Sequence, residues 1–150
     1  MKFVTLFLMS MMTFVTLQAK EYKVVFDCSS ADFDYINKRM WLVGETMDMI
    51  EAKGDTVSVA LTLHGNCVPI VSKAFHEIVD DEEIIDTREA QERLTALSQR
   101  KNIKIIACNM SLNAHDISKK DLLPFVSVSD NSFIDTIRYQ NEGYALMTFK

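Results

Sequence analysis

From residue 22 onward, short apolar runs alternate with segments whose apolar positions repeat at helical spacing. The short runs are rich in valine and isoleucine, and an apolar run of this length between turn residues is typical of a buried strand. We therefore expect strands at residues 22–28, 56–65, 103–108, 125–129 and 144–149.

The segment after the first run has the most regular helical pattern. Its apolar residues recur at spacings of three and four, which predicts a helix that packs one face onto a sheet. These residues are Phe33, Ile36, Met40, Val43, Met47 and Ile50. Ser29 or Ser30 is the expected N-terminal cap. Gly54 is the expected stop, because glycine adopts the left-handed conformation at little cost.

The middle of the chain has a weaker pattern. Residues 66–85 contain Pro69 and an acidic cluster, and they are expected to form a loop with a short helical piece. Asp86 and Glu89 then have the spacing of a capping box, with Asp86 in the cap position. This spacing predicts a helix that continues to about Lys101.

Two further helices are expected in the last third of the chain. A short one should cover residues 111–118. A longer one should begin at a cap formed by Asp130 or Asn131 and end at Gly143. The apolar residues of this helix are Phe133, Ile134 and Ile137.

The regular alternation of strands and helices decides the fold class. It predicts an α/β protein with a mostly parallel five-stranded sheet covered by helices on both faces, a three-layer α/β/α sandwich. Ligand sites in such sheets lie beyond the carboxyl ends of the strands.

Residues 1–19 have a different character. Lys2 is their only charged residue, an apolar stretch follows it, and Ala19 is small enough to precede a cleavage point. This layout is typical of a secretory signal peptide. An uncleaved anchor is the alternative, but the stretch is short for a span of about 20 residues. We predict a signal peptide over 1–19, one domain over 20–150, a periplasmic or secreted location, and no stable membrane span after cleavage.

Composition and charge exclude some classes of protein. Apolar residues make up 48% of the chain and charged residues 25%, which is typical of a globular protein rather than a disordered one. The formal net charge is −5. A general nucleic-acid binder needs a basic face to neutralise phosphates, so we expect no nucleic-acid partner.

Three cysteines and one histidine fall at or just beyond predicted strand ends. Cys28 ends the first strand, His64 ends the second, Cys67 lies just past it, and Cys108 ends the third. If the strands are parallel, all four side chains share one edge of the sheet. An odd number of cysteines leaves at least one thiol unpaired within the chain. The sequence therefore indicates a candidate site at this edge.

Cys108 is the best candidate nucleophile. The helix expected after Asn109 would direct its free amide groups and positive end toward the sulfur, and both favour the reactive thiolate. His64 or His115 could assist it. The alternative is a small buried residue at a strand end, which is common for cysteine. Cys28, beside two serines in a turn, is most simply structural.

Other chemistry has weaker support in the sequence. Cys67 follows His64 by three residues and could form a soft metal site with Cys108 or Cys28, but this spacing is a weak signal and no second ligand pair is present. The phosphate-binding glycine motifs, the G-x-S-x-G elbow and the C-x-x-C dithiol are all absent from the sequence. We therefore expect no resident metal and no cofactor.

Several stretches, in their order, give the chain a family resemblance. They are "YKVVFDCSS" before a long helix, "VALTLHG", "IKIIACNMSL" and "DLLPFVSVSDNSFIDTIRYQNEGYALMTF". With them the chain resembles the DsrE/DsrF-like family of sulfur-relay proteins and their YchN-like relatives. The resemblance implies an α/β/α sandwich, homotrimers or hexamers, and a cysteine after the third strand, here Cys108, that carries sulfur as a persulfide.

The chain departs from this family in two respects. Most sulfur-relay members work in the cytoplasm, whereas this chain carries a predicted export signal. Cys28 and Cys67 are not family hallmarks, and an oxidising compartment could turn Cys108 into a disulfide partner.

Two classes of function follow from this reading. One is an exported sulfur carrier or sulfurtransferase in which Cys108 accepts sulfane sulfur from a donor and passes it to an acceptor, each a protein or a small sulfane-sulfur species. The other is a binding or assembly module of the same fold with structural or redox cysteines. A metal-binding periplasmic protein is a third, weaker alternative.

Overall fold

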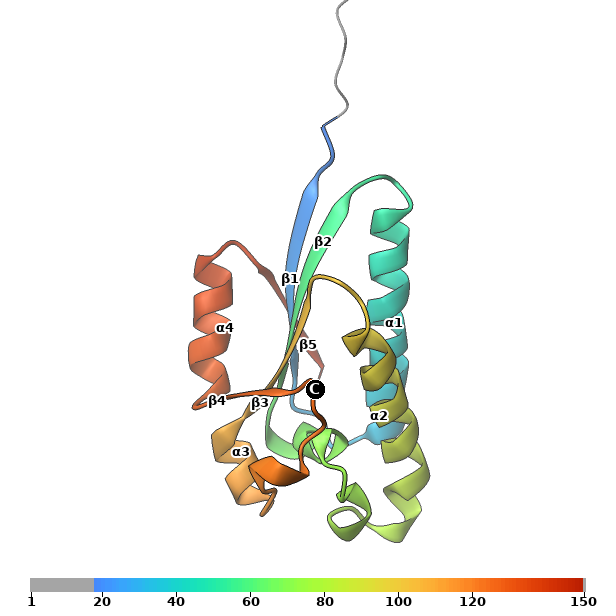
Figure 1. The fold of residues 1–150 in the computed structure, drawn as a ribbon, viewed down its shortest axis with the longest axis vertical. Helices are drawn as coiled ribbons and strands as arrows, with labels where there is room; N and C mark the ends of the chain where they lie inside the picture. Colours follow the sequence, from blue (N-terminus) through green and yellow to red (C-terminus); the bar gives the residue numbers. More distant parts are fainter. Residues whose placement is uncertain (1–17, 150) are drawn as a thin grey trace, which may run out of the picture.

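The computed structural model describes residues 18–149, and within this range five parallel strands form one sheet in the order β4-β3-β2-β1-β5 (Figure 1). The strands are β1 (Glu21–Cys28), β2 (Thr56–Leu63), β3 (Ile103–Cys108), β4 (Ser127–Ser129) and β5 (Ala145–Phe149). The α-helices are α1 (Phe33–Glu51), α2 (Ile84–Ser98), α3 (Asn109–Ala114) and α4 (Ser132–Asn141). The 3-10 helices are η1 (Gly65–Val71), η2 (Phe75–Glu77), η3 (Asp81–Glu83) and η4 (Lys119–Asp121).

Helices cover both faces of this sheet, so the predicted three-layer α/β/α sandwich is confirmed. In Figure 1, α1 and α2 lie on one side of the strands and α4 lies on the other. The larger core cluster joins the sheet to α1, α2 and η1. A smaller cluster, in which Tyr139 of α4 packs on Val25, Ala60 and Ile106, holds the opposite layer.

Helix α1 buries the apolar stripe that its sequence predicts. Phe33, Ile36, Met40, Val43 and Met47 are all buried. The cap differs from the expected serines, since the Asp32 side chain accepts a hydrogen bond of 2.9 Å from the backbone N–H of Tyr35. Asp32 takes this role because it is the extended residue immediately before the first helical turn.

The expected capping box at Asp86 is wrong. Helix α2 begins at Ile84, so Asp86 lies inside its first turn, and the preceding turn, η3, leads directly into the helix. Residues 66–85, expected to form a loop with a short helical piece, contain most of η1, all of η2 and η3, and the first two residues of α2. Gly65 has a φ of 53°, a left-handed conformation that glycine tolerates best, and it turns the chain from β2 into η1.

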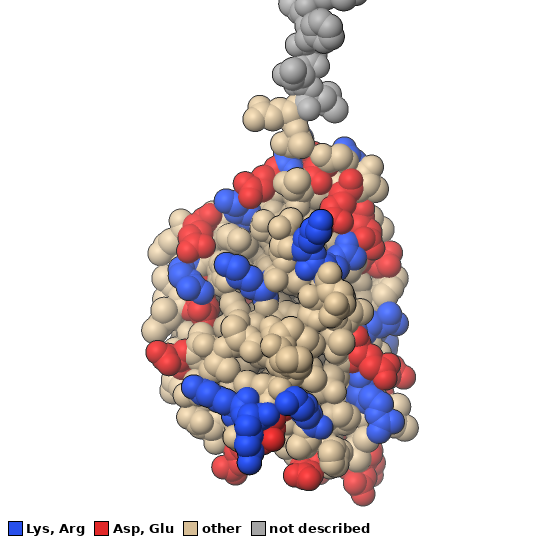
Figure 2. Space-filling model, in the orientation of Figure 1, with Lys and Arg blue, Asp and Glu red and all other residues tan. Residues whose placement is uncertain are grey.

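Most of the predicted signal peptide lies outside the described residues. Between residues 18 and 149, none of the helices combines the length and the apolar character needed to cross a bilayer. Figure 2 shows both basic and acidic side chains on the visible face, with one group of basic side chains at the lower left.

Candidate functional site

The carboxyl ends of β1, β2 and β3 bring the predicted residues together. Cys28 is paired in register with Leu63, the last residue of β2, and Leu63 is paired with Ala107, which precedes Cys108. His64 follows Leu63, and its backbone N–H donates to the carbonyl of Cys28 over 2.9 Å. The predicted gathering of three cysteines and one histidine at one sheet edge is therefore confirmed.

Cys28 and Cys67 form a disulfide, with an S–S distance of 2.04 Å and a Cα–Cα distance of 5.9 Å. Both residues are completely buried. The bond leaves neither sulfur available as a thiolate, so the soft metal site loses Cys67, the ligand that the sequence placed beside His64. Among residues 18–149, no group of three or more histidine, cysteine or acidic side chains could hold a metal ion.

Cys108 is the free thiol of the three, so within the chain it has no disulfide partner. It is 4% exposed and occupies the position before the first turn of α3. Burial raises the pKa of the thiol. Hydrogen bonds from the backbone N–H groups of Ser111, Ser132 and Met110 and from the Ser111 hydroxyl oppose burial, and the net pKa lies below the ordinary value.

Ser111 links the thiol to the turn after β2. Its hydroxyl oxygen accepts a hydrogen bond of 2.8 Å from the backbone N–H of Gly65. The same hydroxyl has one hydrogen, which it donates toward the Cys108 sulfur. Because the hydroxyl accepts from Gly65, its own hydrogen is left to stabilise a thiolate at Cys108.

His64 is held by a carboxylate from the neighbouring strand. Its Nε2 lies 3.0 Å from Oδ2 of Asp27, and the other oxygen of Asp27 accepts a hydrogen bond of 2.6 Å from the Thr62 hydroxyl. The hydrogen bond to Asp27 raises the pKa of His64 above its usual value, with a further contribution from the charge of Cys108. The ring of Phe133 stands edge-on to the imidazole, with the centroids 6.2 Å apart.

The arrangement combines a thiol whose thiolate is stabilised with an imidazole whose protonated form is stabilised. These two charges favour each other, which is the condition for a reactive cysteine at neutral pH. Sequence reasoning found Cys108 and His64 but missed Asp27, Ser111 and Ser132. A signal for Asp27 was present, because it is an acidic residue inside an otherwise apolar strand.

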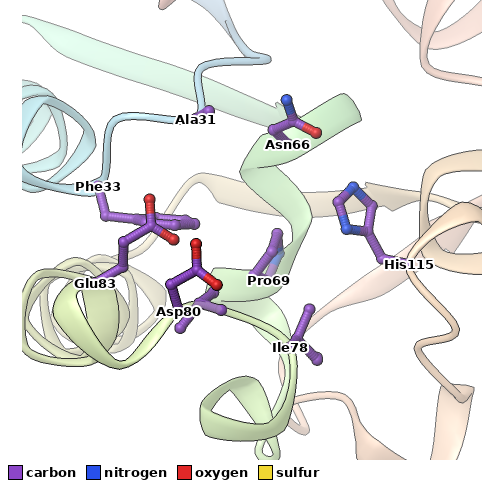
Figure 3. Close-up of a pocket in the computed structure, with 9 residues that line it drawn as sticks. Ala31, Phe33, Asn66, Pro69, Ile78, Asp80, Glu83 and His115 are labelled. Atoms are coloured by element: carbon purple, nitrogen blue, oxygen red, sulfur yellow. The ribbon is translucent and has the colours of Figure 1, made fainter.

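The other two histidines lie away from the thiol. His76 is exposed beside Glu77. His115 lines a pocket of about 170 Å³ (Figure 3), where it faces Asp80 and Glu83 from the opposite side. Cys108 is not among the lining residues of this pocket, so His115 is not shown as an assistant of the thiol.

Comparison with known proteins gives the chain a family. The model of the DsrE/DsrF-like family matches residues 23–149. The chain therefore belongs to the DsrE/DsrF-like family. An uncharacterized protein from Aquifex aeolicus (strain VF5) is 30% identical over 139 residues, which are 90% of this chain and 59% of that protein. The chain thus spans about three fifths of the length of this relative.

A solved structure supports the DsrE-like fold. It is that of MTH1491 from Methanobacterium thermoautotrophicum, a protein of unknown function, with a TM-score of 0.63 and 22% sequence identity. The similarity covers 85% of this chain and 99% of that one. At this identity the likeness concerns the fold alone.

Proposed function

We propose that this DsrE-like protein is an exported sulfur carrier or sulfurtransferase that accepts sulfane sulfur on Cys108 as a persulfide. The observation that carries the proposal is one free thiol at the N-terminus of α3, whose pKa, despite burial, is lowered by hydrogen-bond donors of Ser111, Ser132 and Met110. The pKa of the His64 imidazole is raised by Asp27 and, to a smaller extent, by the charge of Cys108, so a protonated ring would favour the thiolate. Membership of the DsrE/DsrF-like family supports the same reading.

The proposed step needs only a thiolate and a donor with a sulfane sulfur. The Cys108 thiolate attacks the outer sulfur of the donor, a new S–S bond forms, and the S–S bond within the donor breaks. The electron pair of the broken bond leaves with the inner sulfur as a thiolate. The total oxidation level of the two molecules does not change, because one disulfide-type bond replaces another.

His64 has an electrostatic role in this proposal. As an imidazolium it stabilises the thiolate before attack, and it stabilises the negative charge on the persulfide afterwards. The bond to Asp27 keeps the ring charged and in place, since the second oxygen of that carboxylate is anchored by Thr62.

The Cys28–Cys67 disulfide supports the proposed export of the protein. Disulfides of this kind persist in oxidising compartments and are rare in the cytoplasm. The proposal therefore keeps the signal peptide of residues 1–19 and a periplasmic or secreted location. N-terminal sequencing of protein from the envelope fraction should start near Lys20, and an intact chain recovered from the cytoplasm would contradict export.

One observation favours the second candidate, a binding or assembly module without sulfur chemistry. Cys108 is only 4% exposed, which is typical of a cysteine that serves as a small core residue. In that case the lowered pKa would have no chemical consequence, and the thiol would stay inert toward sulfane sulfur.

Mass spectrometry after treatment with inorganic polysulfide separates the two functions. Because Cys28 and Cys67 are joined, the wild-type protein should gain one sulfur, about 32 Da, on its single free thiol. The Cys108→Ser variant should gain none. Uptake by Cys108→Ser equal to that of the wild type would refute the assigned carrier, and an inert wild type would favour the binding module.

A further inference from the structure

A groove between the edge strand β4 and helix α4 adjoins the thiol and has no assigned role. It has a volume of about 440 Å³; its charged lining residues are Lys104, Asp130, Asp135 and Arg138, and Ile106 and Tyr139 line it as well. Two strands supply one wall and α4 supplies the other. The groove therefore lies in the layer opposite α1 and α2 (Figure 1).

Strand register places this groove beside Cys108. Ser129, which lines the groove, is the partner of Cys108 in the parallel ladder of β3 and β4. Partners in register have side chains on the same face, and neighbouring strands lie about 4.8 Å apart. Ser132, whose N–H donates to the Cys108 sulfur, precedes Asp135 by less than one helical turn. Cys108 is not itself a lining residue, but the end of the groove at Ser129 lies next to it.

Two buried polar atoms of the groove have no hydrogen-bond partner. Asp135 is 5% exposed, and while its Oδ1 accepts a bond of 2.8 Å from Arg138, its Oδ2 has none. The hydroxyl oxygen of Ser129 is also buried and without a partner. A buried carboxylate oxygen without a donor is unusual in a native protein, because such groups are almost always satisfied. Oδ2 of Asp135 therefore lacks an N–H or O–H donor.

The charges along the groove indicate what kind of molecule meets that need. Asp135 can accept from an ammonium group, whereas Lys104 and Arg138 can hold a carboxylate. Ile106 and Tyr139 supply apolar surface between them. Inorganic polysulfide and thiosulfate are anions that can pair with Lys104 and Arg138, but they have no cationic group to donate to Asp135.

From these observations we infer that the β4–α4 groove binds the sulfur donor, and that the donor is a zwitterionic persulfide of amino-acid size, carrying one ammonium and one carboxylate group. This inference rests on the proposed function of Cys108. The donor R–S–SH loses its outer sulfur to the Cys108 thiolate, giving Cys108–S–SH and the thiolate R–S⁻. The ammonium on Asp135 and the carboxylate on Lys104 orient the donor so that its sulfur meets Cys108.

Donors that differ by one charged group test this assignment on the wild-type protein. Cysteine persulfide has both groups, cysteamine persulfide lacks the carboxylate, and 3-mercaptopropionate persulfide lacks the ammonium. We expect cysteine persulfide to load Cys108 about tenfold faster than either of the other two donors, as measured by initial rates of mass gain. The reason is that a site whose polar groups bind a charged group of the ligand discriminates against a ligand that lacks this group. Equal rates for the three donors would overturn the inference.

Variants assign the two charged groups to their partners. Asp135→Asn should slow loading by cysteine persulfide about tenfold and leave loading by inorganic polysulfide within about twofold. Lys104→Gln should slow cysteine persulfide but not cysteamine persulfide. Glu142→Gln, at the C-cap of the same helix and outside the groove lining, is the matched control and should change nothing. If Asp135→Asn slows loading by polysulfide as much as loading by cysteine persulfide, the substitution has damaged the thiol rather than a donor site. That result would overturn the assignment.

A binding measurement separates this inference from the proposed function. S-methylcysteine has both charged groups but cannot transfer sulfur. Calorimetric titration of S-methylcysteine into the Cys108→Ser variant should detect binding. In the double variant Cys108→Ser/Asp135→Asn this binding should be about tenfold weaker. If Cys108 takes sulfur from no donor, the proposed function fails while this binding still tests the groove. If polysulfide loads Cys108 but cysteine persulfide does not, the carrier role stands and the groove assignment falls.

Discussion

The Nε2 atom of His64 lies 3.0 Å from Oδ2 of Asp27, so the imidazole at the end of β2 is fixed by a carboxylate at the end of β1. The two residues come from adjacent strands, and Asp27 is paired in register with Thr62, whose hydroxyl holds its second oxygen. The imidazole is therefore held at the same sheet edge at which Cys108 ends β3.

Replacing Asp27 should change the ionisation of both neighbours. In Asp27→Asn the pKa of His64 should fall, because the charged acceptor that raises it is lost. His64 is then neutral at a lower pH, the Cys108 thiolate loses a cationic neighbour, and its pKa should rise.

The pH dependence of Cys108 alkylation checks this prediction. In the wild type, the rate should reach half its maximum below pH 9.0, the ordinary value for a thiol, since the pKa of Cys108 is lowered. In Asp27→Asn the midpoint should move upward, and the NMR titration of the His64 ring should move downward. Glu142→Gln is the control, and a thiol midpoint in Asp27→Asn that matches this control would refute the coupling.

Ser111 should contribute to thiol activation independently of His64. Ser111→Ala removes the hydroxyl that donates to the sulfur and leaves the Gly65 N–H without its acceptor. The alkylation midpoint of Cys108 should rise, while the His64 titration keeps its elevated midpoint. Ser118→Ala, in the loop before η4, gives the matched control. An unchanged thiol midpoint in Ser111→Ala would show that the backbone donors suffice.

The Cys28–Cys67 disulfide should be a large contributor to stability. It closes a loop with a sequence separation of 39 residues, and a loop of this size is worth about 2–4 kcal/mol through restriction of the unfolded chain. The double variant Cys28→Ser/Cys67→Ser should lose about that free energy of unfolding in urea titrations. Addition of dithiothreitol should destabilise the wild type similarly and leave the double variant unaffected. A wild type that is indifferent to reduction would contradict this role.

Helix α4 presents apolar side chains to solvent, and we propose that this face is a contact between copies of the chain in a trimer or hexamer. Phe133, Ile134 and Ile137 are 67%, 62% and 60% exposed. Such a cluster is unusual on a monomer and marks an interaction surface. Ile137→Glu should dissociate the assembly, because an oligomer interface would bury the new charge.

Light scattering at several protein concentrations checks the assembly. The wild type should be a multiple of the monomer mass, and Ile137→Glu should be smaller. Ile85→Glu is the matched control, since Ile85 is 66% exposed but lies on α2 in the other layer. A wild type that stays monomeric at all concentrations would refute the proposal. Equal dissociation by both variants would show that the interface is not specific to α4.

The sequence was sufficient for the layers of the fold, because each strand is a short apolar run and α1 buries a regular stripe of apolar residues. The spacing of Asp86 and Glu89 was misleading, because the chain enters α2 from a preceding 3-10 turn rather than from an extended cap. Local patterns reveal which residues can start a helix, but the path of the chain into the helix decides which one does.

The partners of the thiol were harder to predict for a different reason. Strand ends predicted that Cys108 and His64 would share an edge, since parallel strands finish on the same side. The bond between Asp27 and His64 depends on the register between β1 and β2, and the donation from Ser132 depends on where α4 begins relative to β3. These are long-range relationships between side chains and backbone that no local pattern contains.

The pairing of Cys28 with Cys67 has a consequence for biosynthesis. A polypeptide leaves the ribosome or a translocation channel amino end first, so these two cysteines emerge before Cys108 does. They can be oxidised together while the third is still enclosed. Pairing of the two cysteines in their order of emergence would leave Cys108 as the thiol without a partner within the chain.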